Sequence, residues 1–330
     1  MLAFLRRLKL SYALYNFFHK KQLQYNVPQY KALGINKNFY SSISSEDFRH
    51  LKDSATSTES AEQINTRLKS SSAFNKLNDE SRNSLLTFSE KGFAILKNYF
   101  PSEIIDNINS EIDLLIKTKK VKPLSNNKIM FAYRQSKLLS DIGNKPQLKE
   151  ILSALFGKEA ILFQSINFFK GSEQHTHSDS IHMTTYPTGG LLGVWIALEN
   201  IGEDNGPLHY YPGSHKLPYY MNADYNNEGN KWLLGNKSYT EYEEMIEQKI
   251  MQHNISKEIF YASKGDLLIW HANLFHGGEP HLNKNKTRKS MVFHYFRQGD
   301  ICYHEITQRP ALMSLNNNMD CFLQPTRQQL

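Results

Sequence analysis

The sequence predicts a mainly β protein with flanking helices, built on a double-stranded β-helix, the cupin-like jelly roll of two antiparallel sheets. Two observations predict this fold class. From Ala160 onward, apolar residues alternate with polar ones or run continuously in short segments, as in strands. Gly, Pro and Asn separate these segments, as in the turns of antiparallel sheets. Before Ala160, apolar residues mostly recur at helical spacing, so we expect helices beside the sheets.

Three regions are expected along the chain of 330 residues. Residues 1–84 form an N-terminal extension of helices and loops, residues 85–300 form the jelly-roll domain, and residues 301–330 form an Asn- and Gln-rich C-terminal tail. Large β-barrel enzymes often fold as one unit of this size, and 40% hydrophobic residues supply a sizeable core. The two cysteines, Cys302 and Cys321, are too few for a disulfide framework, so we expect both to be reduced.

The N-terminal residues 1–25 predict an amphipathic helix that carries several cations. The apolar positions at helical spacing are Leu5, Leu8, Tyr12, Tyr15 and Phe18. We favour packing of this helix on the catalytic domain or on a partner subunit. Weak contact with a membrane surface is the alternative.

The amino-acid composition limits which binding partners and which cellular compartment we expect. The net charge of +7 fits a solvated, Lys-rich surface, which we favour, or a preference for anionic substrates or membranes. No zinc-finger or helix-turn-helix pattern is present, so we expect no nucleic-acid binding. No apolar run is long enough to predict a transmembrane segment, and the N-terminus makes a poor signal peptide. We therefore expect a cytoplasmic protein, whose oligomeric state the sequence does not predict.

The elements follow in order. Residues 92–96 predict a strand, and Ser102 is the expected N-cap of a helix that continues to Ile116. A second helix is expected over residues 147–156, with its end at Gly157. Six further strands are expected at residues 161–169, 191–198, 206–211, 258–261, 266–270 and 290–296. The insertion at residues 216–257 predicts a lid, a helix that covers one sheet, or both.

The segment His177-x-Asp179 carries the first chemical signal. Residues i and i+2 of a strand point to the same face, so the imidazole and the carboxylate can reach one metal ion. His276 is the candidate third ligand. Two histidines and one carboxylate on one face of a metal suit non-haem Fe(II), because the open positions can take a co-substrate and O2.

Other histidines offer alternatives for the metal site. His271 competes with His276 for the third position, although the distance to Arg288 favours His276. The pair His175-x-His177 resembles a cupin metal site, but the Glu that a cupin needs a few residues later is missing. A cupin-type metal dioxygenase that does not use 2-oxoglutarate therefore stays an alternative, as does a non-catalytic jelly-roll binding protein.

Arg288 and Ser290 carry the second signal. Arginine binds carboxylates in a bidentate manner, and Ser290 follows two residues later on the same strand face. An enzyme that uses 2-oxoglutarate needs such a partner for the distal carboxylate of that co-substrate. We therefore expect both residues to bind the co-substrate.

A longer set of motifs agrees in order and spacing. The set contains His177-Ser178-Asp179, Gly193 to Leu198, Asn205-Gly206-Pro207-Leu208, Pro212-Gly213-Ser214-His215, Gly265-Asp266, His276-Gly277 and Arg288. With this set the sequence resembles the phytanoyl-CoA dioxygenase family, to which ectoine hydroxylase belongs. The resemblance implies a dioxygenase with Fe(II), 2-oxoglutarate and O2 that hydroxylates an unactivated C–H bond and releases succinate and CO2.

The resemblance also implies further site residues. Trp195 matches a position that lines the co-substrate pocket in relatives, and we add Gln164 and Asn167 from the strand before the metal motif. Asp179 occupies the position that related halogenases leave without a carboxylate, which favours hydroxylation. Arg134, His182 and Tyr186 are the candidate contacts of a small or carrier-bound substrate. No residue beyond the metal ligands is expected to act as a catalytic acid or base.

Overall fold

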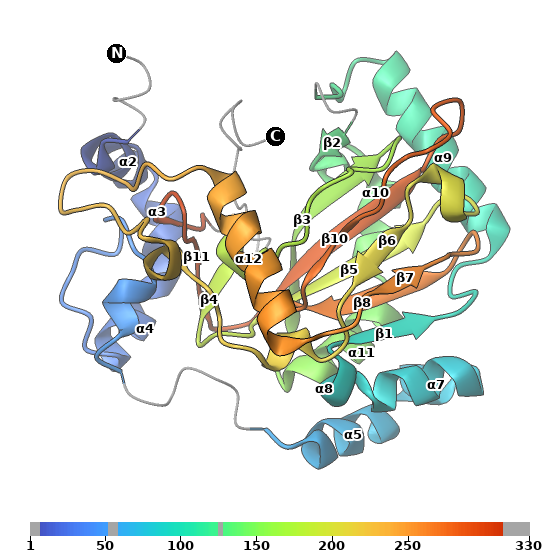
Figure 1. Cartoon of the computed structure of the whole chain (residues 1–330), viewed down its shortest axis with the longest axis horizontal. Coiled ribbons are helices and arrows are strands. Elements are labelled where there is room, and N and C mark those ends of the chain that lie inside the picture. Colours follow the sequence, from blue (N-terminus) through green and yellow to red (C-terminus); the bar gives the residue numbers. More distant parts are fainter. Residues whose placement is uncertain (1–6, 52–58, 125–127, 313–330) are drawn as a thin grey trace.

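The computed structural model describes residues 7–51, 59–124 and 128–312. Its largest feature is a six-stranded sheet with the order β1-β8-β5-β10-β3-β2 (Figure 1). The strands span Phe93–Leu96 (β1), Lys128–Met130 (β2), Ala160–Phe168 (β3), Leu191–Ala197 (β5), Leu267–His271 (β8) and Ser290–Arg297 (β10). All neighbours in this sheet run antiparallel.

Two three-stranded sheets, β7-β6-β9 and β12-β11-β4, complete the β structure. Their strands span Thr184–Tyr186 (β4), Leu208–Tyr210 (β6), Glu258–Phe260 (β7), His276–Gly278 (β9), Ile301–His304 (β11) and Arg309–Pro310 (β12). Tyr210 and Phe260 share an apolar cluster with Trp195 and Trp270 of the large sheet. Antiparallel sheets that face each other across such a core form a jelly roll, so the predicted fold class is confirmed.

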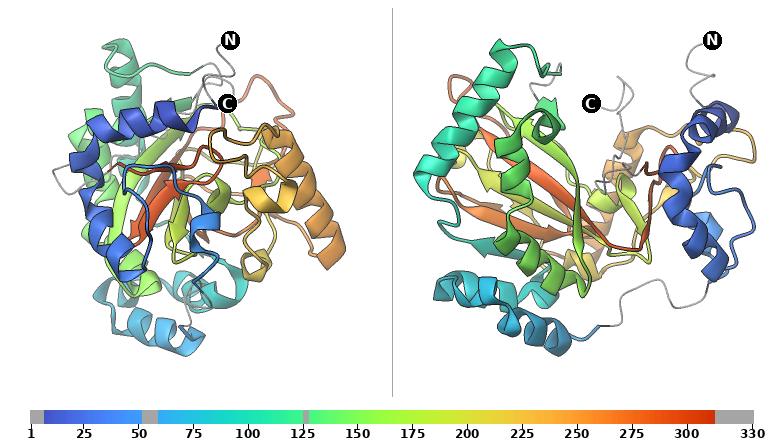
Figure 2. Two further views of the ribbon diagram at one scale, coloured as in Figure 1. Left: turned by 90° about the vertical axis from the view of Figure 1, so that its left-hand side faces the viewer. Right: turned by 180° about the vertical axis from the view of Figure 1, so that it is seen from behind.

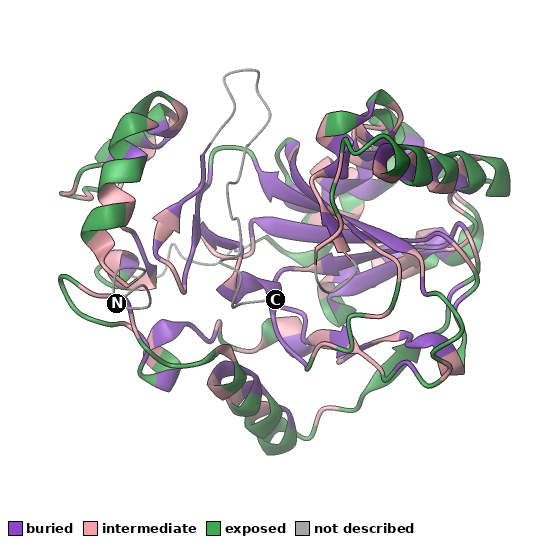
Figure 3. Ribbon diagram, turned by 90° about the horizontal axis from the view of Figure 1, so that it is seen from above, coloured by how far each residue is buried: buried purple, intermediate pink, exposed green. Residues whose placement is uncertain are grey.

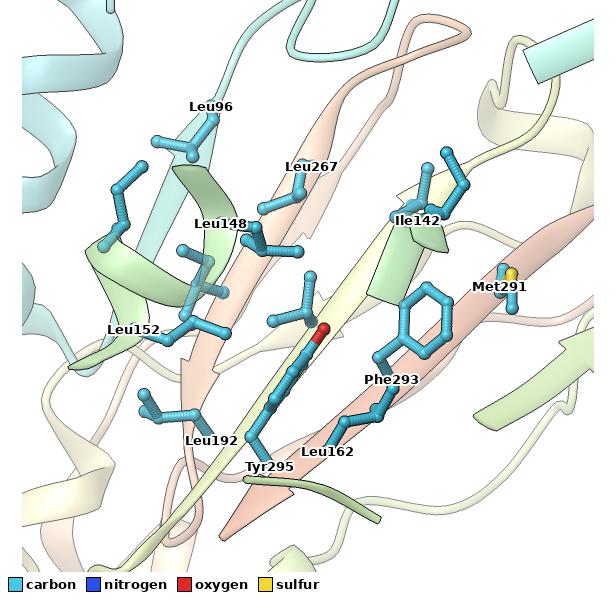
Figure 4. Close-up of a cluster of buried hydrophobic side chains, with 14 of the residues drawn as sticks. Leu96, Ile142, Leu148, Leu152, Leu162, Leu192, Leu267, Met291, Phe293 and Tyr295 are labelled. Carbon is cyan, nitrogen blue, oxygen red and sulfur yellow. The ribbon is translucent and has the colours of Figure 1, made fainter. Parts of the chain in front are cut away.

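Alternate residues of the central strands face two different cores. On β5, Leu192 and Val194 belong to the core on the helix side, whereas Trp195 and Ala197 belong to the core between the sheets. This follows from the strand period of two. Figure 4 shows part of the helix-side core, to which β5, β8 and β10 each contribute. In Figure 3 the strands are mostly buried (purple), and the outer faces of the helices are exposed (green).

Helices cover the outer face of the six-stranded sheet (Figure 2). The α-helices of the described residues are α2 (Lys9–Phe18), α3 (Lys20–Leu23), α4 (Val27–Ala32), α5 (Ala61–Ser70), α6 (Ser72–Asn75), α7 (Asp79–Leu86), α8 (Phe88–Lys91), α9 (Ser102–Lys117), α10 (Lys137–Gly143), α11 (Pro146–Phe156) and α12 (Tyr239–His253). Within these residues, no helix combines the length and the apolar character that crossing a membrane requires.

Helices α9 and α11 agree with the predicted segments. The buried stripe of α9 consists of Ile105, Ile108, Ile112 and Leu115. Full burial of each such side chain contributes about 1.5–3 kcal/mol. Gly157 ends α11 with a φ of +70°, the left-handed conformation that closes many helices. The expected capping role of Ser102 is wrong, because Pro101 holds the cap position and its carbonyl accepts the first helical hydrogen bonds.

The expected boundary after residue 84 does not separate two cores. Leu68, Phe74 and Leu85 from α5, α6 and α7 belong to the same apolar cluster as the six-stranded sheet. These helices therefore form part of the jelly-roll domain. The expected C-terminal tail also begins within the fold, since β11 is a buried strand that pairs with β4 on one side and with β12 on the other. Cys302 is buried and reduced there, whereas Cys321 lies outside the described residues.

The N-terminal helix is shorter than expected. Residues 1–6 lie outside the described residues, and α2 ends at Phe18 because the chain changes direction at His19 before α3 and α4. In Figure 1 these helices lie beside β4 and β11, at the end of the molecule away from α9. Phe48, which follows them, stacks on Tyr186 with ring centroids 4.1 Å apart. The N-terminal segment thus packs on the strands next to the jelly roll.

Glu305 connects this N-terminal segment to the insertion. Its fully buried carboxyl group accepts hydrogen bonds from the backbone nitrogen (2.9 Å) and the hydroxyl (2.8 Å) of Ser45. The backbone nitrogen of Asn222, in the insertion, lies 3.4 Å from the same carboxyl. Burial raises the pKa of Glu305 from 4.5 to about 7, although the hydrogen bonds from Ser45 oppose the shift. Around neutral pH, ionisation of this carboxyl therefore opposes folding.

We expect Glu305→Gln to change how stability depends on pH. Between pH 4.5 and about 7 the folded protein retains a proton on Glu305 that the unfolded chain has released, so stability falls as pH rises through this window. Glutamine removes this contribution, which amounts to about 3 kcal/mol across the window. Urea unfolding of both proteins at pH 5 and pH 8 measures it. If the free energy of unfolding of Glu305→Gln changed between pH 5 and pH 8 as much as that of the wild type, the assignment would be contradicted. Glu244→Gln, at an exposed position, serves as the matched control.

The insertion packs on the two segments that carry the predicted metal ligands. Tyr242 and Ile246 of α12 share an apolar cluster with Ile181 and Phe275. Ile181 follows Asp179 in the chain, and Phe275 precedes His276. The insertion therefore forms a wall beside these segments, and its action as a lid stays a prediction.

Candidate metal centre

The structure brings His177, Asp179 and His276 together. One ligand atom from each residue lies within 4.8 Å of the other two. Among the described residues, these three form the cluster of His, Cys, Asp or Glu side chains that could hold a metal ion. The Nε2 atoms of His177 and His276 each lie 3.8 Å from a carboxylate oxygen of Asp179. Paired backbone hydrogen bonds between residues 177 and 276 hold the two histidines side by side.

Backbone carbonyl groups orient the imidazole rings of both histidines. The Nδ1 atom of His177 lies 2.9 Å from the carbonyl oxygen of His175, and that of His276 lies 2.9 Å from the carbonyl oxygen of Leu274. A proton on Nδ1 donates to each carbonyl, which leaves the lone pair on Nε2, the atom that would bind a cation. In the structure the amide nitrogen of Gln174 lies 3.3 Å from Nε2 of His177, so a cation would take its place. Burial, followed by the nearby His276, lowers the pKa of His177 to about 3. The neutral form that metal binding requires is therefore favoured.

Two residues that the sequence analysis missed orient Asp179. The indole Nε1 of Trp270 donates to Asp179 Oδ2 at 2.8 Å, and His294 Nε2 lies 3.6 Å from the same oxygen. Burial alone would raise the pKa of Asp179, but His276 and His294 outweigh it and hold the pKa well below its usual range. The carboxylate is thus ionised and fixed in direction, as a metal ligand must be.

A glycine makes room for this arrangement. Gly193 of β5 pairs in register with Trp270 of β8. A Cβ atom at Gly193 would lie 2.2 Å from the indole ring. Since the ring packs directly on this backbone, any side chain at residue 193 would displace the hydrogen bond to Asp179.

Arg288 is a buried cation that forms no ion pair with a carboxylate in the described part of the chain. Its Nε donates to the carbonyl oxygen of Gly206 at 3.0 Å, and its Nη1 donates to the hydroxyl of Ser290 at 2.8 Å. Burial lowers the pKa of Arg288 to about 10, so the guanidinium is still charged at neutral pH. A buried charge without a counter-ion destabilises the folded state, and the carboxylate of a bound ligand would neutralise it.

The Asn205-Gly206 turn positions this arginine. Gly206 has a φ of +74°, a conformation that favours glycine and directs its carbonyl toward Arg288. The amide of Asn205 donates to the carbonyl of Thr287, immediately before Arg288, at 3.0 Å. The turn motif therefore holds the start of β10 in place.

Trp195 and Gln164 lie on the interior face, and Asn167 does not. The guanidinium of Arg288 lies 5.9 Å from the Trp195 ring centroid, and Trp195 Nε1 is a buried donor without a partner in the described structure. Gln164 pairs in register with His294, whereas Asn167 pairs with Met291, which belongs to the helix-side core. The structure thus places Asn167 on the sheet face away from the metal group.

Among the candidate substrate contacts, His182 lies beside the metal group. Its ring centroid is 6.4 Å from that of His177 and 5.5 Å from that of His304. Tyr186 instead packs against Phe48 in the cluster beneath the N-terminal segment. Arg134 lies over the ring of Phe131 at 4.2 Å.

The structure separates the competing histidines from the metal group. His175 is largely exposed and lies 3.5 Å from Glu247 of α12, so it does not form a cupin pair with His177. His271 faces His215, with ring centroids 5.3 Å apart, and its Nδ1 accepts from the backbone of Asn273. The geometry thus favours His276 over His271.

One further missed residue is Lys128 on the edge strand β2. It pairs with Phe168, whose side chain packs between the sheets, so Lys128 faces the interior. Burial lowers its pKa to about 8, and it forms no ion pair in the residues that the structure describes. Lys128 is therefore a cation available to a bound anion.

Comparisons with known proteins agree with this geometry. The family model "Phytanoyl-CoA dioxygenase (PhyH)" matches residues 88–290. The chain is 34% identical to phytanoyl-CoA dioxygenase domain-containing protein 1 of Danio rerio over 28% of this chain and 34% of that protein. It is 24% identical to the human peroxisomal phytanoyl-CoA dioxygenase over 66% of this chain and 69% of that protein. The chain spans about a third of the length of the first curated relatives it matches.

A solved structure has the same fold. EctD from S. alaskensis, determined with 2-oxoglutarate and 5-hydroxyectoine, has a TM-score of 0.53 and 17% identity, with 77% of this chain and 88% of that chain covered.

Proposed function

Because the chain belongs to the phytanoyl-CoA dioxygenase family of Fe(II)- and 2-oxoglutarate-dependent oxygenases, we propose that it hydroxylates an unactivated C–H bond of a small or carrier-bound metabolite. The observation that carries the proposal is the combination of the His177, Asp179 and His276 group with a buried, unpaired Arg288. A cytoplasmic location stays a prediction beside it.

The donor set fits Fe(II). Two neutral imidazoles and one carboxylate form the ligand set of non-haem iron oxygenases, and cysteine ligands that would favour zinc are absent from the group. Bound there with 2-oxoglutarate, the iron would activate O2, with release of succinate and CO2 and transfer of one oxygen atom to the substrate. Trp270 and His294 would keep the Asp179 carboxylate turned toward the ion.

The residues around Arg288 fit the co-substrate. A carboxylate can pair with its guanidinium. The same carboxylate can accept hydrogen bonds from the hydroxyl of Ser290 and from the unpartnered indole nitrogen of Trp195. Phe168 and Trp195 flank the guanidinium at 5.7 and 5.9 Å, so apolar surface would exclude water from the pair. Excluding water strengthens such a charge pair and protects the reaction from side products.

The test needs no substrate. We expect 2-oxoglutarate, added to anaerobic Fe(II)-loaded protein, to produce a visible charge-transfer absorption band. Under air, slow uncoupled turnover should form succinate. A screen of metabolites then follows succinate formation above this background.

A folded, iron-loaded protein that gives no band and does not bind 2-oxoglutarate would contradict the proposal. The cupin-type dioxygenase would then come first if the protein still consumed O2 with some substrate. The non-catalytic binding protein would come first if Asp179→Ala left its biological role intact.

A further inference from the structure

Helix α2 exposes apolar side chains and buries a polar one. The exposed fractions are 62% for Leu10, 54% for Leu14, 43% for Phe17 and 81% for Phe18. The spacing of these four residues places them on one face of the helix. Asn16 is instead only 1% exposed, and its amide donates to the carbonyl of Tyr40 at 3.0 Å. The helix is thus anchored to the protein by its polar side and presents its apolar side outward.

An exposed tryptophan of the insertion lies at the N-terminal end of this helix. Trp232 is 65% exposed, and its carbonyl accepts a hydrogen bond from the backbone nitrogen of Lys9 at 2.9 Å. The carbonyl of Arg7 accepts from the backbone nitrogen of Leu234 at 2.8 Å, and the guanidinium of Arg7 donates back to the carbonyl of Leu234. We call Leu10, Leu14, Phe17, Phe18 and Trp232 together the docking surface.

The N-terminal residues that carry most of the docking surface are rich in cations. No Asp or Glu precedes Glu46 in the sequence. The cations of this stretch are Arg6, Arg7, Lys9, Lys20, Lys21, Lys31 and Lys37. Lys20 lies 5.0 Å from the ring centroid of Phe17, and Lys231 lies 5.3 Å from the ring centroid of Trp232. Cations therefore border the apolar side chains.

We propose that the docking surface binds a membrane surface rich in anionic lipid, with α2 lying in the plane of the interface. A helix with exposed Leu and Phe and with Lys beside them binds lipid by apolar burial and by attraction to anionic headgroups. Tryptophan is enriched at the same depth, because its ring is apolar and its N–H is polar. The excess of cations over carboxylates in residues 1–45 favours this partner over a protein surface of mixed charge.

Docking would place the metal centre near the lipid. Arg309 lies 5.3 Å from the ring centroids of Tyr12 and Tyr15 on α2, and it pairs in register with His304 of β11. His304 lies beside His182, which neighbours the ligand His177. Contacts through Arg309, His304 and His182 thus connect α2 to the metal group.

Sedimentation with vesicles tests the proposal on the full chain. Vesicles of phosphatidylcholine alone are compared with vesicles that also contain phosphatidylglycerol. We expect binding to the anionic vesicles only, and weaker binding as salt rises from about 0.05 to about 0.5 M, because salt screens the attraction. Leu14→Gln with Phe18→Gln should lower the partition coefficient at least about tenfold, since glutamine keeps helix propensity and removes apolar area. Lys20→Gln and Lys21→Gln should each lower it about fivefold.

The controls are Met251→Gln and Leu282→Gln. Both residues are large, apolar and exposed, at 72% and 67%, and both lie outside the docking surface, so these variants should bind like the wild type. Equal binding to neutral and anionic vesicles, or full binding by the Leu14→Gln, Phe18→Gln variant, would overturn the proposal. A dimer that this variant dissociates, without lipid binding by the wild type, would show that a second copy covers the surface and would overturn it too. The assay uses no iron or 2-oxoglutarate, so its outcome is independent of the proposed activity.

Discussion

Asp179→Ala is expected to abolish iron binding and succinate formation. Asp179 supplies the negative charge of the ligand group, and both histidine ligands lie 3.8 Å from its oxygens. Loss of a residue that only orients a ligand typically costs 10–100-fold in metal affinity, so loss of the ligand itself should cost more than about 100-fold. Fe(II) titration and a succinate assay measure the two effects.

Two companion variants make this test specific. Trp270→Phe keeps an aromatic ring and removes the N–H that donates to Asp179, so its affinity for iron should fall about 10–100-fold. Asp106→Ala removes an exposed carboxylate that pairs with Lys264 at the surface, and it should bind iron normally. If Asp179→Ala retained wild-type iron affinity while folded, the metal would lie elsewhere.

Arg288→Met is expected to remove binding of 2-oxoglutarate and to spare the fold. Truncating one partner of a buried, hydrogen-bonded charge pair costs about 2–5 kcal/mol, which corresponds to an increase in Kd of about 30- to 5,000-fold. Methionine fills similar space without charge, and the buried wild-type guanidinium has no carboxylate partner among residues 7–51, 59–124 and 128–312. The unliganded variant should therefore be at least as stable as the wild type.

Thermal unfolding with and without 2-oxoglutarate separates these effects. The co-substrate should raise the Tm of the iron-loaded wild type and leave that of Arg288→Met unchanged. Arg288→Lys should respond weakly, because lysine keeps the charge and loses the bidentate geometry. Arg49→Met, at an exposed position, should respond like the wild type. Normal stabilisation of Arg288→Met by 2-oxoglutarate would rule out this anchor.

Strands with long apolar segments were predictable from sequence. Of the three-residue strands, β6 and β7 were predicted as parts of longer segments, whereas β2, β4 and β9 were not. The predicted segments around β3, β5, β8 and β10 agree with the structure because each is long enough for its period to stand out. The three-residue strands β2, β4 and β9 carry too few residues to show a period. β9 also holds His276 and two glycines, which do not favour strands on their own.

The two strand faces explain why Gln164 and Asn167 differ. Alternation shows that residues three apart on a strand face opposite sides, but it does not tell which side meets the metal. Both central faces are apolar, because helices cover one and a second sheet covers the other. Only the pairing with β10 shows that Gln164 lies with His294 and that Asn167 lies with Met291. His294 itself shared the face of Arg288 and Ser290, so the period of two pointed to it.

Sequence patterns were enough to predict the jelly-roll class, the candidate ligands His177, Asp179 and His276, and the pair Arg288 and Ser290. The pairs His177–Asp179 and Arg288–Ser290 follow from a spacing of two residues, and His276 follows from its distance to Arg288 along the chain. In the structure Asp179 begins a 3-10 helix, Asp179–Ile181, and does not lie in a strand. Tertiary structure alone decided that Trp270 and His294 orient Asp179, that Arg288 is buried without a carboxylate, and that α2 turns its apolar side outward. Each of these depends on strand register or on the rotation of a helix about its axis. Contacts between segments far apart in the chain determine both, and local sequence preferences do not.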